Sequence, residues 1–306
     1  MSSGVATNRT HITLPTDVSA EILQKTQERS AIMQLARQIA LPGRGLTIPV
    51  ITADPEASWV DETDEKPVSN PTLSTKIMQA YKLAVIVPFS NEFKRDMNAL
   101  YDALIARLPN ALGLKFDATV FGSGNKPGDN FDNFASCTAQ SISGESGVYG
   151  ALVAADTDIA THGGVLNGFA MSPQGKGELL SALDTTKRPL FVNNVSEGAV
   201  PTLIGAPVKY TKGAYIAGSG ASGTSGQSGY VAAVPDLIGI AGDWTQAMYG
   251  TVEGVDISVS DQATLTIGNS AINLWQRNMF AVRAEIEVGF RADTACFNKI
   301  VRTHSA

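Results

Sequence analysis

Two strand-like segments about thirty residues apart constrain the fold of this chain more than any other feature. "LTIPVI" (46–51) and "YKLAVIVPF" (81–89) are rich in β-branched residues, and the stretch between them contains Pro55, Pro67 and Pro71. Connections longer than about 12 to 15 residues are usually functional or disordered, so a short hairpin does not fit. We therefore predict a long two-stranded arm, which needs another surface to pack on because a lone hairpin is marginal in water.

The connection between the two strands carries a tryptophan among acidic residues. Trp59 opens the stretch "WVDETDEK" (59–66), which is dense in carboxylates. Like charges packed this closely repel one another and favour a solvated loop, whereas an exposed tryptophan forgoes the burial of a large apolar side chain. We interpret Trp59 as an anchor that docks on another chain. The alternative is that Trp59 packs on its own domain.

Helical periodicity flanks the predicted arm on both sides. Apolar residues recur at helical spacing from Thr16 to Ala40, as one helix or as two short ones. A longer helical run follows Ser90, a good N-cap, and ends at the turn "GSGNKPGDN" (122–130). Pro109 lies inside this run and is expected to kink or briefly break it.

The second half of the chain mixes short strands with short helices, which indicates an α+β domain. The Ser/Gly-rich stretch 218–229 reads as a flexible loop. Apolar and polar residues alternate over 280–290, as in a half-buried strand of an antiparallel sheet. The short strands expected in the middle region include "GFAMSP" (168–173), "PLFV" (189–192) and "GAPVKY" (205–210).

The composition indicates a folded protein that does not grip nucleic acid by charge. The chain has 306 residues, of which 43% are hydrophobic and 17% charged, with a net charge of -6. A protein that grips a phosphate backbone is normally basic, so any nucleic acid is enclosed rather than bound tightly. Because no run approaches the ~20 apolar residues of a membrane helix and no apolar leader is present, we expect a cytosolic protein.

No catalytic, cofactor or metal site can be assembled from the motifs. "GSGASG" (218–223) matches a dinucleotide fingerprint, but no helix follows it. "AMSPQGKG" (170–177) departs from a P-loop at its first and last positions. The two cysteines and three histidines are too dispersed for a metal site or a catalytic triad. We expect no enzymatic activity and no cofactor.

Six segments in a fixed order carry a likeness to a known family. They are "LPTDVSAEILQKTQERSAIMQLA" (14–36), the stretch from "TIPVI" to "SNEF" (47–93), "GFAMSPQGKGELLSALDTTKRPLF" (168–191), "LIGAPV" (203–208), "GDWTQAMYG" (242–250) and "NLWQRNMFAVRAEIEVGFRADTACFNKIV" (273–301). In this order the chain resembles the major capsid proteins of tailed double-stranded-DNA phages, which share the Hong Kong 97-type capsid fold. The resemblance covers about Leu14 to Val301.

The resemblance implies an α+β chain of the Hong Kong 97 type with four parts. Residues 1–42 form an N-terminal arm, and residues 43–88 form a long two-stranded extended loop. A peripheral domain with a spine helix and a long C-terminal strand takes 89–149 and 273–306. A central axial domain takes 150–272.

The resemblance also implies a structural role. Such chains self-assemble as pentamers and hexamers into an icosahedral shell that encloses double-stranded DNA without sequence-specific binding. The virion capsid, assembled in the host cytoplasm, is then the location, and a membrane is not a partner. Scaffolding, portal and decoration proteins are further partners that the resemblance implies. Because this chain starts almost at the arm, we expect the scaffolding function in a separate protein, or a scaffolding segment that is already absent.

Two sets of residues follow from the resemblance. The family's extended loop lies over a neighbouring subunit, so Trp59, Glu62 and Lys66 are the predicted inter-subunit residues. Gly242, Asp243 and Trp244 form a family-like segment. A covalent crosslink through the loop lysine, as in some relatives, has no matching motif around it here.

Three other readings stay open at this point. An encapsulin-type nanocompartment shell protein has the same fold and houses enzymes instead of DNA. A hydrolase would form a small oligomer with a deep pocket. A tail or other virion structural protein would form tubes or rings.

Overall fold

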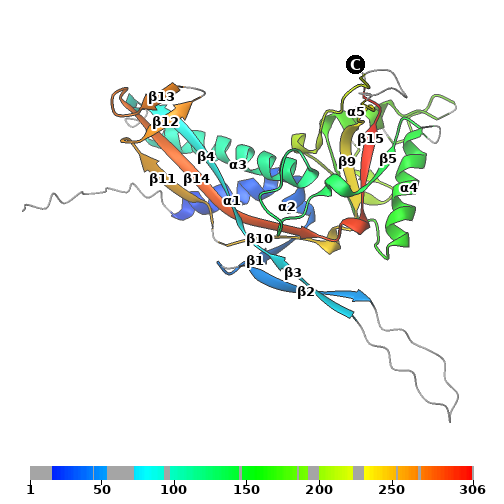
Figure 1. The fold of residues 1–306 in the computed structure, drawn as a ribbon. Coiled ribbons are helices and arrows are strands. Elements are labelled where there is room, and N and C mark those ends of the chain that lie inside the picture. Colours follow the sequence, from blue (N-terminus) through cyan, green and yellow to red (C-terminus); the bar gives the residue numbers. More distant parts are fainter. Residues whose placement is uncertain are drawn as a thin grey trace, which may run out of the picture.

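Two β-sheets lie at opposite ends of an elongated molecule (Figure 1). The computed structural model describes residues 16–43, 45–53, 72–92, 97–144, 147–184, 186–191, 200–222, 231–252, 254–267 and 270–304. The helices are α1 (Thr16–Arg29), α2 (Ala31–Leu35), α3 (Met97–Phe121), α4 (Gly147–Thr161) and α5 (Pro173–Ser181), with short 3-10 turns at η2 (Phe134–Ser136) and η3 (Lys212–Ala214).

The first sheet is built around the longest strand, as the alternating pattern over 280–290 predicts. Its strands are β1 (Arg37–Ala40), β10 (Ala247–Thr251), β14 (Met279–Ala292), β11 (Asp256–Ser260) and β4 (Tyr81–Ser90). β14 pairs antiparallel with β4 along one side, and with β10 and β11 on the other. Phe280, Val282 and Ile286 bury one face of β14 against Leu108 and Leu112 of α3.

The second sheet has six strands and is covered by α4. In order across the sheet they are β5 (Thr138–Ser141), β15 (Phe297–Arg302), β9 (Asp236–Gly242), β6 (Gly168–Met171), β8 (Ala206–Tyr210) and β7 (Thr202–Leu203). Every residue of the central strand β9 is buried. Leu152 and Ile159 of α4 belong to the same core as Phe169 and Ile300 of the sheet.

Two hairpins belong to neither of these sheets. β2 (Leu46–Ala53) pairs with β3 (Thr72–Met78), and β12 (Thr264–Ile267) pairs with β13 (Ser270–Asn273). Within the described residues, neither hairpin pairs with a further strand. The β2–β3 hairpin leads away from both sheets, so a two-stranded arm is present (Figure 1). Its second strand is β3, however, and not the predicted 81–89, which forms β4 and pairs with β14 in the first sheet.

Three other local predictions need correction. Arg37–Ala40 is the strand β1 and does not continue the helices before it, because it pairs in parallel with β10. α3 runs without interruption through Pro109, with Leu108 and Leu112 buried beside it, so packing outweighs the lost backbone hydrogen bond. The described part of the predicted strand 189–192 forms only an isolated bridge between Leu183 and Pro189.

The strand pairing divides the chain between the sheets differently from the predicted domain boundaries. β10 and β11 fall within the predicted axial domain, yet they join the first sheet through β14. β5 and β15 fall within the predicted peripheral domain, yet they join the second sheet. Sequence periodicity identifies a strand but not its ladder partner, so the domain boundaries stay a prediction.

Candidate functional site

Two short connections lead directly from one sheet to the other, and these two crossings lie against each other. β9 passes into β10 through η4 (Trp244–Gln246), and β14 passes into β15 through η5 (Thr294–Cys296). The backbone N–H of Asp243 donates to the carbonyl of Cys296 at 3.1 Å, and the N–H of Asp293 donates to the carbonyl of Gln246 at 3.1 Å. These reciprocal bonds fix the orientation of one sheet relative to the other.

Asp243 holds this double crossing together. Its carboxylate accepts hydrogen bonds from the N–H of Val165 at 3.0 Å, from Nδ2 of Asn167 at 2.7 Å and from the N–H of Thr245 at 3.0 Å. Burial alone would raise the pKa of this carboxyl, but the hydrogen bonds together lower it below its ordinary value. The group therefore stays ionised and acts as a structural acceptor.

The other two residues of the predicted family-like segment pack at the same place. The buried ring of Trp244 lies edge-on to Phe134 and to Phe297, with centroids 5.9 Å and 5.2 Å apart. A Cβ on Gly242 would collide with the ring of Phe297, so this position requires glycine. The segment therefore lies at the junction of the sheets, and its part in assembly stays a prediction.

The root of the β2–β3 hairpin sits directly on the first sheet. Gly250 of β10 and Gly289 of β14 are paired residues that leave a flat surface there. A Cβ on Gly289 would lie 2.6 Å from the carbonyl oxygen of Gln79, and one on Gly250 would collide with Leu41 and Met78. Side chains at these two glycines would push the hairpin off the sheet.

Arg291 fixes the direction in which the hairpin leaves the sheet. Its Nε donates to the carbonyl of Ile77 in β3 at 2.8 Å. Its two terminal nitrogens bind Asp132 and Asn130, at 2.8 Å and 2.9 Å, in the turn that follows α3. One side chain thus joins β14, the hairpin and the turn after the long helix. Sequence reasoning missed it because Arg291 continues the polar face of an alternating strand.

A buried carboxylate attaches the N-terminal helices to α3. Asp117 of α3 accepts hydrogen bonds from Oγ of Ser30 at 2.5 Å and from the N–H of Ala31 at 3.1 Å. Burial raises the pKa of the Asp117 carboxyl to about 6, against the lowering effect of these hydrogen bonds. The only sequence signal for this site is one acidic residue between the apolar positions Phe116 and Val120.

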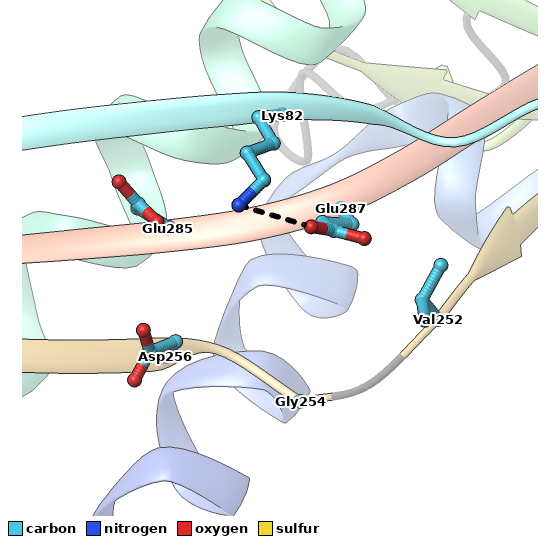
Figure 2. A pocket seen from close by; sticks show the side chains of 6 residues that line it. All are labelled: Lys82, Val252, Gly254, Asp256, Glu285 and Glu287. Carbon is cyan, nitrogen blue, oxygen red and sulfur yellow. Dashed lines mark ion pairs between the residues drawn. The ribbon is translucent and has the colours of Figure 1, made fainter. Parts of the chain in front are cut away.

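A polar groove lies on the exposed face of the first sheet (Figure 2). Lys82 of β4 reaches toward β14, and its Nζ lies 3.3 Å from a carboxylate oxygen of Glu287. Glu285 and Asp256 line the same groove from β14 and β11.

In the part of the chain that the structure describes, no group of His, Cys, Asp and Glu is placed to hold a metal ion. None of the described helices is long and apolar enough to cross a membrane.

The predicted inter-subunit residues Trp59, Glu62 and Lys66 lie outside the described residues. They belong to the stretch 54–71, which connects β2 to β3. The architecture around them is a long hairpin fixed at its root by Gly250, Gly289 and Arg291. The role of these three residues at a subunit contact therefore stays a prediction.

Comparison with known proteins identifies the architecture. Residues 10–294 match the model of the phage capsid family. This chain belongs to the phage capsid family. It is therefore a structural protein of the phage capsid, and the sheets, the long helix and the hairpin are parts of a shell subunit.

Two named relatives agree with the family assignment along nearly the whole chain. This capsid protein is 26% identical over 297 residues to the probable major capsid protein gp17 of Mycobacterium phage L5, covering 92% of this chain and 86% of the relative. It is 26% identical over 303 residues to the major capsid protein of Staphylococcus phage 80alpha, covering 94% and 85%. Nothing in these matches supports a nanocompartment protein or a hydrolase.

The fold of this capsid protein is also shared with solved structures. A chain from Microbacterium phage Oxtober96 superposes with a TM-score of 0.68 at 20% identity, covering 90% of this chain and 91% of that one. The predicted α+β class of the Hong Kong 97 type is confirmed.

Proposed function

We propose that this chain is a major capsid protein whose copies self-assemble into the closed shell around the double-stranded DNA of a tailed phage. The observation that carries the proposal is the match to the phage capsid family over residues 10–294, which takes in the first sheet, α3 and the long hairpin. The relatives from phages L5 and 80alpha carry the names probable major capsid protein and major capsid protein.

The shell is built from pentamers and hexamers. A closed shell requires contacts that close on themselves by rotational symmetry, and one sequence must then tolerate two slightly different sets of neighbours. The first sheet and α3 supply the part of the subunit that stays the same in every position of the shell. They share one hydrophobic core, which contains Leu108 of α3 and Phe280 of β14. The N-terminal arm (1–42) and the connection 54–71 supply the adjustable part.

The inter-subunit contact runs through Trp59, Glu62 and Lys66. Support comes from the β2–β3 hairpin, which extends from the body and pairs with no other described strand of its own chain. An aromatic side chain buried in a partner's pocket carries much of an interface's energy, which suits Trp59. Charged residues around such an anchor set register more than affinity, which suits Glu62 and Lys66.

The shell encloses DNA without reading its sequence. The net charge of -6 supports enclosure, because binding to a phosphate backbone depends on clustered positive charge. The protein works without enzymatic activity or a cofactor, is assembled in the host cytoplasm and resides in the virion capsid. Scaffolding, portal and decoration proteins are its further partners.

The test compares wild-type protein with Trp59→Ala. Wild type, purified alone or with a candidate scaffolding protein, is expected to form closed polyhedral particles in electron micrographs. Trp59→Ala should form fewer particles while its circular dichroism and thermal unfolding stay those of the folded subunit. Wild-type protein that gives only small oligomers under both conditions would refute the proposal, and normal shells from Trp59→Ala would refute the role of that residue.

A further inference from the structure

An open apolar cavity of about 220 Å³ lies beside the hairpin root, between α3, the start of β4 and the turn after α3. Three aromatic residues line it, Tyr81, Phe116 and Phe131. Tyr81 lies edge-on to Phe131 with centroids 6.2 Å apart, and Phe131 lies edge-on to Phe116 at 6.3 Å. Leu83 and Val288 add aliphatic surface. An apolar cavity of about 150 Å³ holds a benzene molecule, so this one has room for a larger aromatic ring.

The charge around the cavity is positive. Its lining contains two lysines, Lys82 and Lys115, and no acidic residue. Lys82 is paired with Glu287 on the groove side of the sheet. Lys115 is exposed on α3, and its ammonium group forms no ion pair with any residue that the structure describes. An aromatic residue with carboxylates next to it in the sequence would therefore suit this cavity better than an aromatic residue without acidic neighbours.

The connection between β2 and β3 has this chemistry. Trp59 is the one aromatic residue of the stretch 54–71, and Asp61, Glu62 and Asp64 follow it closely. The aromatic ring fits the aromatic walls, and the carboxylates complement the positive rim at Lys115.

The reach of the chain decides which copy supplies Trp59. β2 has eight residues and spans about 23 Å from the hairpin root at Leu46 to Ala53. Trp59 lies six residues beyond Ala53, so a fully stretched backbone places it at most about 22 Å from that end. Folded straight back, it would regain only the root, whereas the cavity begins beyond the root at Tyr81. Trp59 of another copy meets no such limit.

We propose that the cavity formed by Tyr81, Phe116 and Phe131 receives Trp59 of a second copy of this chain, with Lys115 facing the carboxylates that follow the tryptophan. This inference rests on the proposed function, because it requires copies of the chain to meet in a shell. It adds the receiving site to the anchor and gives the contact a direction from the hairpin of one subunit to the hairpin root of the next.

The test places the photoreactive residue p-benzoylphenylalanine at position 59, which keeps an aromatic ring there. Shells are assembled from this variant, labelled with nitrogen-15, and an excess of unlabelled wild type, so that wild-type chains carry assembly. After irradiation, mass spectrometry locates the crosslinks. We expect crosslinks from a labelled to an unlabelled chain, within residues 79–83 or 115–131. The same probe at Tyr149, exposed on α4, should crosslink elsewhere.

Charge reversal at the cavity provides the second readout. Lys115→Glu in the wild-type partner should lower the yield of the position-59 crosslink about tenfold, because it turns attraction into repulsion. Lys187→Glu is the matched control, because it makes the same change in the exposed loop after α5, and it should leave the yield unchanged.

The outcomes separate the two proposals. If wild type forms shells but position 59 crosslinks within its own chain, to other residues or not at all, the cavity is not the receiving site and the shell function stands. An unchanged yield with Lys115→Glu also overturns the charge argument. If wild type forms no shells under any condition, the proposed function itself fails.

Discussion

The buried carboxylate of Asp117 makes the stability of the subunit depend on pH in an unusual direction. Most paired carboxylates are more acidic in the folded state, whereas burial raises the pKa of Asp117 from 3.8 to about 6. The folded chain therefore holds this proton more tightly than the unfolded chain does. The stabilisation from this group is complete below pH 3.8 and is lost as the pH rises through about 6.

The size of the effect follows from the difference between the two pKa values. The interval from 3.8 to about 6 corresponds to about 3 kcal/mol of unfolding free energy. The variant Asp117→Asn lacks the titration. Its amide accepts through one oxygen only, so it loses part of the contact with Ser30 and Ala31 by an amount that does not vary with pH.

Urea unfolding of wild type and Asp117→Asn, followed by tryptophan fluorescence, measures the effect. Between about pH 3 and about pH 7, the unfolding free energy of wild type should fall by about 3 kcal/mol relative to the variant. A difference between the two proteins that is independent of pH would refute the reasoning. A wild type that gains stability relative to the variant over this interval would show that the hydrogen bonds outweigh burial.

Three further changes test the contacts that hold the hairpin and the sheets. Gly289→Val should lower the unfolding free energy by about 1 to 3 kcal/mol, because its side chain meets Gln79 and Met78. Thermal unfolding measures this. The control Gly177→Ala lies in α5 with open space around it and should cause no loss, because alanine is favoured over glycine in a helix by about 1 kcal/mol. Arg291→Lys should lower the unfolding free energy in urea by about 1 to 3 kcal/mol, because one ammonium group does not span the contacts to Ile77, Asp132 and Asn130. Unchanged stability would contradict the role given to Arg291. Asp243→Ala should lower the unfolding free energy by about 2 kcal/mol or more, because it removes the cap of η4 and leaves buried donors unpaired. Calorimetry that shows no change would exclude Asp243 as the group that holds the two crossings together.

The sequence predicts the elements of this fold better than their partners. The alternation over 280–290 identifies β14, because a half-buried strand must alternate. The long proline-containing stretch after 46–51 indicates an arm. It does not identify the arm's second strand, because β2 pairs with β3 and the predicted partner 81–89 pairs with β14. Neither pattern states that β10 and β11 join β14, since ladder pairing depends on how distant segments meet. Arg37–Ala40 becomes a strand for the same reason, through its contact with β10.

The residues of the candidate site likewise differ in how well the sequence predicts them. Trp59 is visible in the sequence because an aromatic residue among carboxylates is out of place. Asp117 and Arg291 are harder to find, because each is one charged residue in an ordinary amphipathic pattern. Their importance comes from burial and from partners far away in the chain, Ser30 in one case and Ile77 and Asp132 in the other.

The measurement that tests the central claim most directly is an electron-microscopic reconstruction of the particles formed by the purified chain, alone and beside a candidate scaffolding protein. The account predicts closed icosahedral shells in which copies of this chain occupy both five-fold and six-fold positions. Open tubes, or small discrete oligomers under both conditions, would contradict it.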